Sequence, residues 1–209
     1  MDLINQLEWR YATKKFDSEK KVSPSDLAYL KRAIQLSPSS YGLQLYKVLV
    51  IEDAAIREKL KPVSWDQNQI TDCSHLFVFC IPNEYDPKDV DEYIKLTSQV
   101  RDVALNQLEG YGSFMKTKLG EQSAEELATW MGHQPYLALS NLMMAGASLG
   151  IDVCPMEGFE SEAYDEILQL KEQNLTACVI GTVGYRHQED ASQNQAKVRK
   201  PLNLLFEDL

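Results

Sequence analysis

Apolar positions recur at helical spacing in the N-terminal part of the chain. Residues 2–11 are predicted to form a helix that turns Leu3, Ile4 and Leu7 inward. A second helix is predicted within 23–37, where the letters S-P-S-D place a serine at the N-cap, a proline at the first helical position and an acid in the first turn. The apolar residues of this segment fall on one face, so the helix is expected to pack against a core.

Two longer helical regions follow in the middle of the chain. The segment 88–116 has helical spacing with a weakening at 110–112, where two glycines flank a tyrosine. The segment 123–149 is nearly all apolar after Tyr136 and is predicted to end at Gly150. A helix of this composition belongs in a core or at a subunit interface.

Continuous apolar runs predict the strands. They cover 48–51, 75–81 and 176–184, and the first two lack polar alternation, so both are expected to be buried on two faces. Three or four strands in a mostly helical chain predict an α+β sandwich with a small central sheet and helices on both sides. The length of 209 residues suits a single domain, residues 1–209.

The charge balance limits the classes of partner. A net charge of −10 and a pI of about 4.8 argue against nucleic acid and anionic membranes as partners, since both require a basic surface. The N-terminal residues do not resemble a signal peptide, and the apolar stretch 135–151 is interrupted and too short for a bilayer. We therefore expect a cytoplasmic protein. The cysteines form no C-x-x-C pair and are expected to be core thiols: Cys73, Cys80, Cys154 and Cys178.

Several catalytic classes lack their motifs. The sequence contains no P-loop, no G-x-G-x-x-G fingerprint for a Rossmann site and no G-x-S-x-G elbow. The histidines His75, His133 and His187 are far apart and near no paired cysteine, so no metal is expected. His75, which opens an apolar run, is expected to be a hydrogen-bonded core or edge histidine.

Cationic and small polar residues form a scattered set of candidates. Arg10 and Lys14 lie in R-Y-A-T-K, and Lys197 and Arg199 lie in K-V-R-K-P near the other end of the chain. In an acidic protein these cations need acidic neighbours or an anionic ligand, and phosphate suits both side-chain types. For Arg10 and Lys14 the alternative is that they are solvated basic residues at the end of a helix, where they complement its dipole.

The whole constellation, in this order, resembles the FMN-dependent nitroreductase family from residue 1 to about residue 202. The resemblance implies the nitroreductase-like fold, with Arg10, Lys197 and Arg199 around the FMN phosphate. It implies that Lys14 stabilises negative charge at the N1–C2 edge of the flavin. The chain departs from the family at Ala12, where serine is common, so one phosphate hydrogen bond is expected to be missing or supplied by the backbone.

Further cofactor contacts follow from the same resemblance. The turn that contains Ser39 and Ser40 would come from the other subunit, although as a pattern it is only a serine-rich turn that ends a helix. Gln69, and second Gln67, would read the pyrimidine edge, and the backbone N–H of Glu157 would point at flavin N5. The full set of expected FMN contacts is Arg10, Tyr11, Ala12, Lys14, Pro38, Ser39, Ser40, Gly42, Gln67, Gln69, Pro155, Met156, Glu157, Gly158, Lys197 and Arg199.

The resemblance also implies an activity. NADH or NADPH would deliver hydride to flavin N5, and a nitroaromatic, quinone or similar small-molecule acceptor would then be reduced in the same pocket. The expected substrate contacts are Lys14, Ser40, Tyr41 and Phe114. Phe114 is expected in a loop-like interruption between the long helices, and the alternative is that it is a core residue. For Tyr41 the alternative is a packed surface position. Two other functions remain open, a specialised flavin or dihydropteridine reductase and a non-enzymatic FMN storage or sensing protein. The expected assembly is an intertwined homodimer in which the residues from about 200 to 209 form an arm that packs onto the partner subunit.

Overall fold

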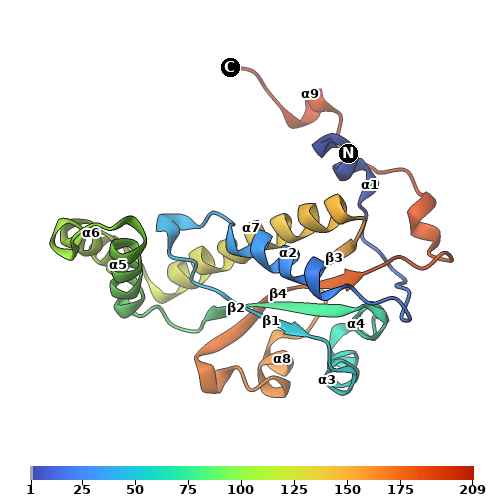
Figure 1. Cartoon of the computed structure of the whole chain (residues 1–209), viewed down its shortest axis with the longest axis horizontal. Helices are drawn as coiled ribbons and strands as arrows, with labels where there is room; N and C mark the ends of the chain where they lie inside the picture. Colours follow the sequence, from blue (N-terminus) through green and yellow to red (C-terminus); the bar gives the residue numbers. More distant parts are fainter. Residues whose placement is uncertain (1) are drawn as a thin grey trace.

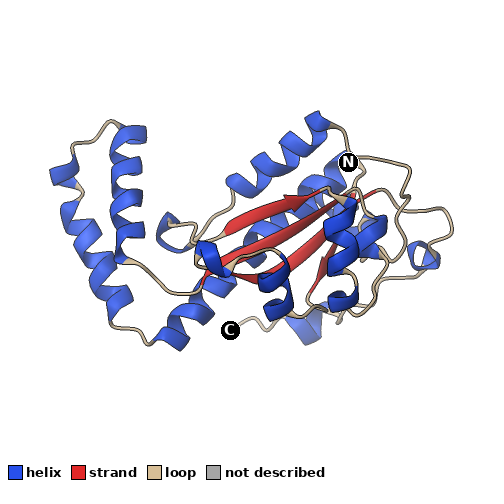
Figure 2. Ribbon diagram, turned by 90° about the horizontal axis from the view of Figure 1, so that it is seen from below, coloured by secondary structure: helices blue, strands red, loops and turns tan. Residues whose placement is uncertain are grey.

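A computed structural model describes residues 2–209 as a four-stranded sheet between two layers of helices (Figures 1 and 2). The helices and strands follow in the order α1 Leu3–Trp9, α2 Pro24–Gln35, β1 Lys47–Ile51, α3 Ala54–Leu60, α4 Gln69–Asp72, β2 His75–Pro82, α5 Pro87–Arg101, α6 Glu109–Gly120, α7 Ala124–Leu149, β3 Asp152–Met156, α8 Ser161–Ile167, β4 Leu175–Gly184 and α9 Leu202–Leu205. This is the α+β sandwich that the sequence predicts.

The sheet has the strand order β1-β2-β4-β3, and every neighbouring pair is antiparallel. The two long central strands, β2 and β4, are almost entirely buried; this burial was predicted for 75–81, whereas 176–184 was predicted only as a strand. The short edge strand β3 was not predicted, because its five residues include a proline and border the loop that follows.

Side chains of β2 alternate between two cores. Leu76, Val78 and Cys80 lie in the core beneath α3, α4 and α8, whereas Phe77 and Phe79 lie in the core against α2 and α7. Alternation along a strand sends successive side chains to opposite faces, so a strand covered on both sides is apolar throughout. This explains why the strand appears in the sequence as a continuous hydrophobic run.

The predicted ends of α2 and α7 are confirmed. The Ser23 hydroxyl accepts a hydrogen bond from the N–H of Asp26, and Ser123 forms a capping box with Glu126 at the start of α7. The α7 helix ends at Gly150, which adopts the left-handed conformation with φ of 69°.

Three expectations about the elements are wrong. Leu3, Ile4 and Leu7 are 58%, 61% and 42% exposed, because α1 packs only loosely on the rest of its own chain. β1 is an edge strand that is buried fully only at Ile51. The break in the segment 88–116 falls between α5 and α6 rather than at the glycines, which lie inside α6.

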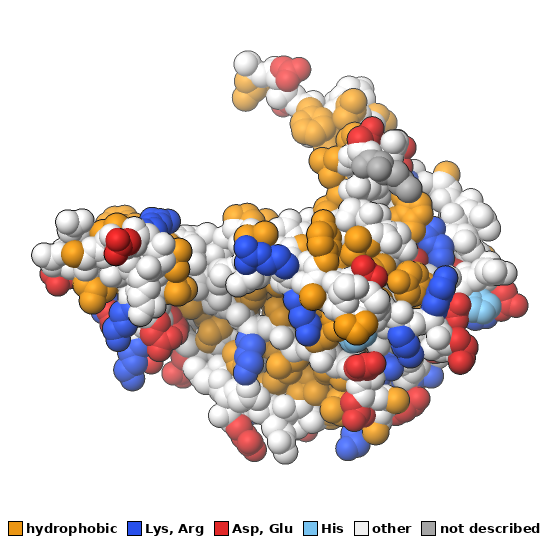
Figure 3. Space-filling view, in the orientation of Figure 1, with side chains coloured by type: hydrophobic (Ala, Val, Ile, Leu, Met, Phe, Trp, Pro, Cys, Tyr) orange, Lys and Arg blue, Asp and Glu red, His pale blue; other side chains and the backbone are white. Residues whose placement is uncertain are grey.

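The C-terminal segment extends away from the sandwich. Figure 1 shows α9 and the last residues beside α1 and apart from the body of the molecule, and Figure 3 shows hydrophobic side chains gathered on this projection. The exposed apolar residues of the segment are Leu202, Leu204, Leu205, Phe206 and Leu209. Among residues 2–209, no helix is long and apolar enough to cross a membrane.

Candidate active site

The cations from the two ends of the chain meet in one cavity. This cavity of about 300 Å³ is lined by Arg10, Tyr11, Ala12, Lys14, Ser192, Gln195, Ala196, Lys197 and Arg199. The Lys197 ammonium donates a hydrogen bond of 2.7 Å to the carbonyl oxygen of Glu8, which ties the C-terminal segment to the end of α1. The structure therefore brings together Arg10, Lys197 and Arg199, the three cations predicted to surround a phosphate.

Positive charge in the cavity is incompletely compensated. The Nε atom of Arg10 is buried and has no hydrogen-bond partner among the described residues. Burial lowers the pKa of Arg10, and the positive charge of Arg199 lowers it further. Burial also lowers the pKa of Lys197, with further lowering by the charges of Arg10 and Arg199. A buried, unpaired donor among cations that repel one another is the arrangement expected where an anion binds.

Asp190 shapes the segment that carries Arg10 and Lys14. Its buried carboxylate accepts hydrogen bonds from the Tyr11 hydroxyl at 2.9 Å and from the backbone N–H groups of Lys14 and Lys15 at 2.8 and 3.2 Å. Burial by itself would raise the pKa of Asp190, but these hydrogen bonds outweigh it and the pKa is lowered. The carboxylate thus stays ionised and fixes the backbone beside the cavity.

Arg186 fixes the aromatic residues of the same segment. Its guanidinium lies 4.1 Å from the ring centroid of Trp9 and 4.5 Å from that of Tyr11. The other side of this group forms an ion pair with the buried Asp152, with Nη2 and Oδ1 2.6 Å apart. Arg186 therefore connects the end of β4 to both flanks of Arg10.

The predicted loop after Val153 begins in a strand. Pro155 and Met156 belong to β3, and Glu157 and Gly158 follow as a short loop before α8. Burial raises the pKa of the Cys154 thiol, and the positive charges of Lys14 and Arg10 oppose this rise, which is consistent with β3 lying close to the cation cavity.

The loop itself is held by side chains from two other elements. The carboxylate of Glu157 accepts a hydrogen bond of 2.6 Å from the Tyr136 hydroxyl of α7. The Gln67 Nε2 donates to the carbonyl oxygen of Gly158 at 2.9 Å. A Cβ atom at position 158 would lie 2.9 Å from this amide nitrogen and 2.9 Å from the ring of Trp65, so a larger residue would displace at least one of these side chains.

Gln67 and Gln69 differ in what they can offer a ligand. The Gln67 nitrogen already donates to the carbonyl oxygens of Ser64 and Gly158, so its oxygen is the group left to accept a hydrogen bond. Gln69 is 5% exposed at the start of the one-turn helix α4. The Arg57 guanidinium stabilises that helix by donating hydrogen bonds to the carbonyl oxygens of Ile70 and Thr71. The assignment of either glutamine to a pyrimidine edge stays a prediction.

The serine-containing turn lies elsewhere in the single chain. Pro38, Ser39, Ser40 and Gly42 follow α2 and lie beside the α5–α6 hairpin, on the other side of the molecule from α1 and the C-terminal segment (Figure 1). One chain therefore does not bring this turn to the cation cavity.

The two predicted aromatic substrate contacts are neighbours. The rings of Tyr41 and Phe114 meet edge to face with centroids 6.4 Å apart. The prediction that Phe114 lies in a loop is wrong. It lies within α6, because the break between the helices comes before the glycines and not at them. It is 48% exposed, so it is not a core residue.

Sequence reasoning missed Asp190, Arg186 and Tyr136. Each acts through a partner distant along the chain; Asp190 and Lys14, for example, are 176 positions apart. No local pattern distinguishes such a carboxylate from the many on the surface.

The expectation that His75 is a hydrogen-bonded core or edge histidine is confirmed. It is 4% exposed, and its Nδ1 lies 2.9 Å from the Ser74 hydroxyl.

Comparison with known proteins decides the family. The model of the nitroreductase family matches residues 7–185. The chain belongs to the nitroreductase family. A relative from Staphylococcus haemolyticus that carries the name of an NAD(P)H nitroreductase is 33% identical over 213 residues, which cover 98% of this chain and 96% of that protein.

Solved nitroreductase structures share the fold over the full length of the chain. A crystal structure from Bacillus subtilis described as a nitroreductase has a TM-score of 0.88 at 20% identity and covers 99% of this chain and 98% of its own. A nitroreductase from Exiguobacterium sibiricum, solved in complex with FMN, has a TM-score of 0.84 at 17% identity and covers 100% and 98%. The fold predicted from the resemblance is thereby confirmed as a nitroreductase fold.

Proposed function

We propose that this chain is an FMN-dependent NAD(P)H oxidoreductase that reduces nitroaromatics, quinones or similar acceptors. The observation that carries the proposal is the buried Nε of Arg10 in the cation cavity, which has no hydrogen-bond partner within residues 2–209. The name of the relative from Staphylococcus haemolyticus supports the nicotinamide, and the FMN complex of the structural neighbour supports the cofactor.

The residues present fit FMN as a ligand. Arg10, Lys197 and Arg199 would hold its phosphate with charge-assisted hydrogen bonds. Bound FMN would supply the ability to take up a hydride from NADH or NADPH and release the electrons to an acceptor. Per cycle, a quinone acceptor would gain two electrons and two protons, one proton arriving with the hydride and the other from solvent.

The chain's own groups would orient and stabilise rather than exchange protons. Lys14 would place its positive charge beside the pyrimidine side of the ring, where negative charge develops on reduction. Glu157 would offer its backbone N–H to N5, since its carboxylate is already engaged by Tyr136. Gln67, which donates to the carbonyl of Gly158, would hold that loop in position.

We further propose that the active unit is a homodimer. The cation cavity and the Ser39–Ser40 turn lie apart in one chain, and a second copy would bring its own turn to the first copy's cavity (Figure 1). Exposed apolar side chains support the same assembly, because monomers rarely leave so many together. They lie on α1, α7 and the C-terminal arm: Leu3, Ile4, Leu7, Tyr136, Leu137, Leu202, Leu204, Leu205 and Phe206.

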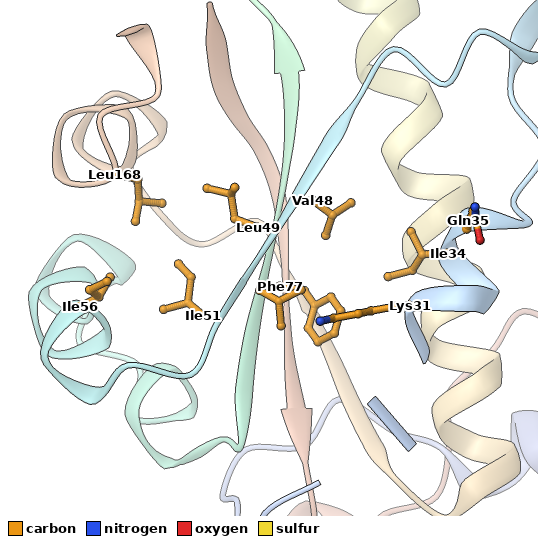
Figure 4. A pocket seen from close by; sticks show the side chains of 10 residues that line it. Lys31, Ile34, Gln35, Val48, Leu49, Ile51, Ile56, Phe77 and Leu168 are labelled. Atoms are coloured by element: carbon orange, nitrogen blue, oxygen red, sulfur yellow. The ribbon is translucent and has the colours of Figure 1, made fainter. Parts of the chain in front are cut away.

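The edge of the sheet offers a place for the arm of the partner. Within residues 2–209, β1 pairs with β2 alone, which leaves the backbone groups of its other edge available. A groove of about 700 Å³ runs along β1, with Leu49 and Ile51 on one side of the strand and Val48 on the other (Figure 4). Its mostly apolar lining matches the exposed leucines and phenylalanine of the arm.

Titration with FMN and riboflavin tests the proposed cofactor, because the two ligands differ only in the phosphate. FMN should bind at least about a hundredfold more tightly, since two or more charge-assisted hydrogen bonds are at stake. Arg199→Ala should weaken binding of FMN by about 1.5–3 kcal/mol and leave binding of riboflavin unchanged. Lys200→Ala, which removes the adjacent cation outside the cavity, is the matched control. Equal affinity for the two ligands, or wild-type FMN affinity in Arg199→Ala, would contradict the phosphate assignment.

A further inference from the structure

Gln134 joins the middle of α7 to the turn that follows α2. Its side-chain oxygen accepts a hydrogen bond of 2.7 Å from the backbone N–H of Ser40, and its nitrogen donates to the carbonyl oxygen of Trp130 at 3.0 Å. The residue is 6% exposed. A buried amide with both ends engaged has one orientation, so it fixes the turn relative to the helix.

The turn that Gln134 holds is in an unusual conformation. Tyr41 follows Ser40 directly and has φ of 55° and ψ of 0°, in the left-handed region that side chains larger than glycine rarely occupy. Such a conformation is unfavourable for a residue with a side chain and persists only where the surroundings impose it. The hydrogen bond from Ser40 to Gln134 is the restraint next to it.

This conformation places Tyr41 among two other rings. The centroid of Tyr41 is 6.3 Å from that of Trp130 on α7 and 6.4 Å from that of Phe114 on α6. We call these three residues the aromatic wall. Tyr41 and Trp130 are half-buried and Phe114 is 48% exposed, so the wall is open to solvent on one side.

We propose that Gln134 is a positioning residue that fixes the aromatic wall, and that it thereby sets how strongly the site favours flat aromatic acceptors over compact ones. The inference rests on the proposed function, in which the Ser39–Ser40 turn borders the flavin. Gln134 lies on the same helix as Trp130, one turn further along, and accepts from the backbone that leads into Tyr41. It therefore fixes the turn that carries one ring relative to the helix that carries another.

The preference follows from how aromatic rings attract one another. Offset or edge-on contacts between rings contribute about 0.5–1.5 kcal/mol beyond the area that they bury. A bicyclic quinone gains this contribution from the wall, whereas a compact inorganic acceptor such as ferricyanide does not. The ratio of kcat/KM for the quinone to that for ferricyanide therefore measures how much the aromatic wall contributes to the reaction with an acceptor. In a reaction with two half-reactions, kcat/KM for the acceptor is independent of the step with the nicotinamide, so changes in that step leave the ratio unaffected.

The test compares the wild-type holoenzyme with Gln134→Met, using a naphthoquinone and ferricyanide as acceptors. Methionine keeps the volume but cannot accept from Ser40. The ratio of kcat/KM for naphthoquinone to that for ferricyanide should fall on the order of two- to tenfold. Trp130→Leu, which removes one ring and leaves Gln134 intact, should lower the ratio similarly, and it covers the case in which Gln134→Met does not fold.

Asn141→Ala is the matched control. Asn141 also extends an amide from α7 to this connection, where it donates to the Ser37 hydroxyl at 2.8 Å, but it lies about three helical turns from Trp130. The control should leave the ratio unchanged. An unchanged ratio in folded Gln134→Met would overturn the positioning role of Gln134, and an unchanged ratio in Trp130→Leu would overturn the role of the wall. An equal fall in Asn141→Ala would also overturn the inference. A wild-type protein that neither NADH nor NADPH can reduce would instead contradict the proposed function.

Discussion

At the scale of single residues, the geometry of the cation cavity depends on Arg186 and Asp190, which do not line it. The buried Nε of Arg10 has no hydrogen-bond partner among the described residues, and the neighbours of Arg10 are held in place. Arg186 contacts the rings of Trp9 and Tyr11, and Asp190 accepts from the backbone that follows. Fixed neighbours reduce the entropy lost when an anion is bound. Positioning and binding are thus divided between different residues.

Asp190→Asn should destabilise the protein in a way that depends on pH. At neutral pH the substitution should lower the free energy of unfolding by about 1–3 kcal/mol, because backbone N–H groups lose a charged acceptor. The pKa of Asp190 is lowered in the folded state, so its contribution is present in full above the ordinary pKa near 4 and is lost as the pH falls through the lower, folded value.

Chemical denaturation of both proteins between pH 7 and pH 3 measures this effect. The difference between wild type and Asp190→Asn should be constant down to about pH 5 and should shrink below about pH 4. Glu189→Gln is the control, because its ion pair with Lys15 is exposed and should contribute little. A difference that persists unchanged at pH 3 would show that Asp190 does not act as a carboxylate.

At the scale of elements, the sequence predicted what depends on local pattern. Capping residues and apolar spacing located α2 and α7, and continuous apolar runs located β2 and β4. Two of the errors share one cause, namely that sheet edges and subunit interfaces are decided by neighbouring elements and not by local pattern. The run 48–51 has the composition of a central strand but lies at the edge of the sheet, and α1 has an apolar face that its own chain leaves exposed.

Removal of residues 202–209 tests the role of the C-terminal arm. If the arm docks on β1 of a partner, the truncated protein should dissociate at concentrations where the full chain is a dimer, and it should retain less FMN. Size-exclusion chromatography with light scattering measures the assembly, and removal of only Asp208 and Leu209 is the control. A full-length protein that is monomeric and binds FMN, or a truncated protein that remains as tightly dimeric, would contradict the arm assignment.

At the scale of the whole molecule, the candidate site is assembled from distant parts of the sequence. The resemblance could predict the charged residues of the cavity because their types and order are distinctive, and the structure brings them together. It could not predict Gln134, Asp190 or Arg186, since each is recognisable only by contacts that the fold creates. The turn at Ser39 and Ser40 completes a site only if a second copy supplies it.

The most direct test of the account is an absorbance spectrum of the FMN-loaded protein without oxygen, before and after addition of NADH or NADPH. The account predicts flavin bands that bleach with at least one nicotinamide and return when a naphthoquinone is added. The nicotinamide that bleaches them faster is the preferred reductant. Flavin bands that neither nicotinamide changes would contradict the proposed oxidoreductase and favour storage or sensing of FMN. A protein that takes up no FMN would contradict the interpretation of the cation cavity itself.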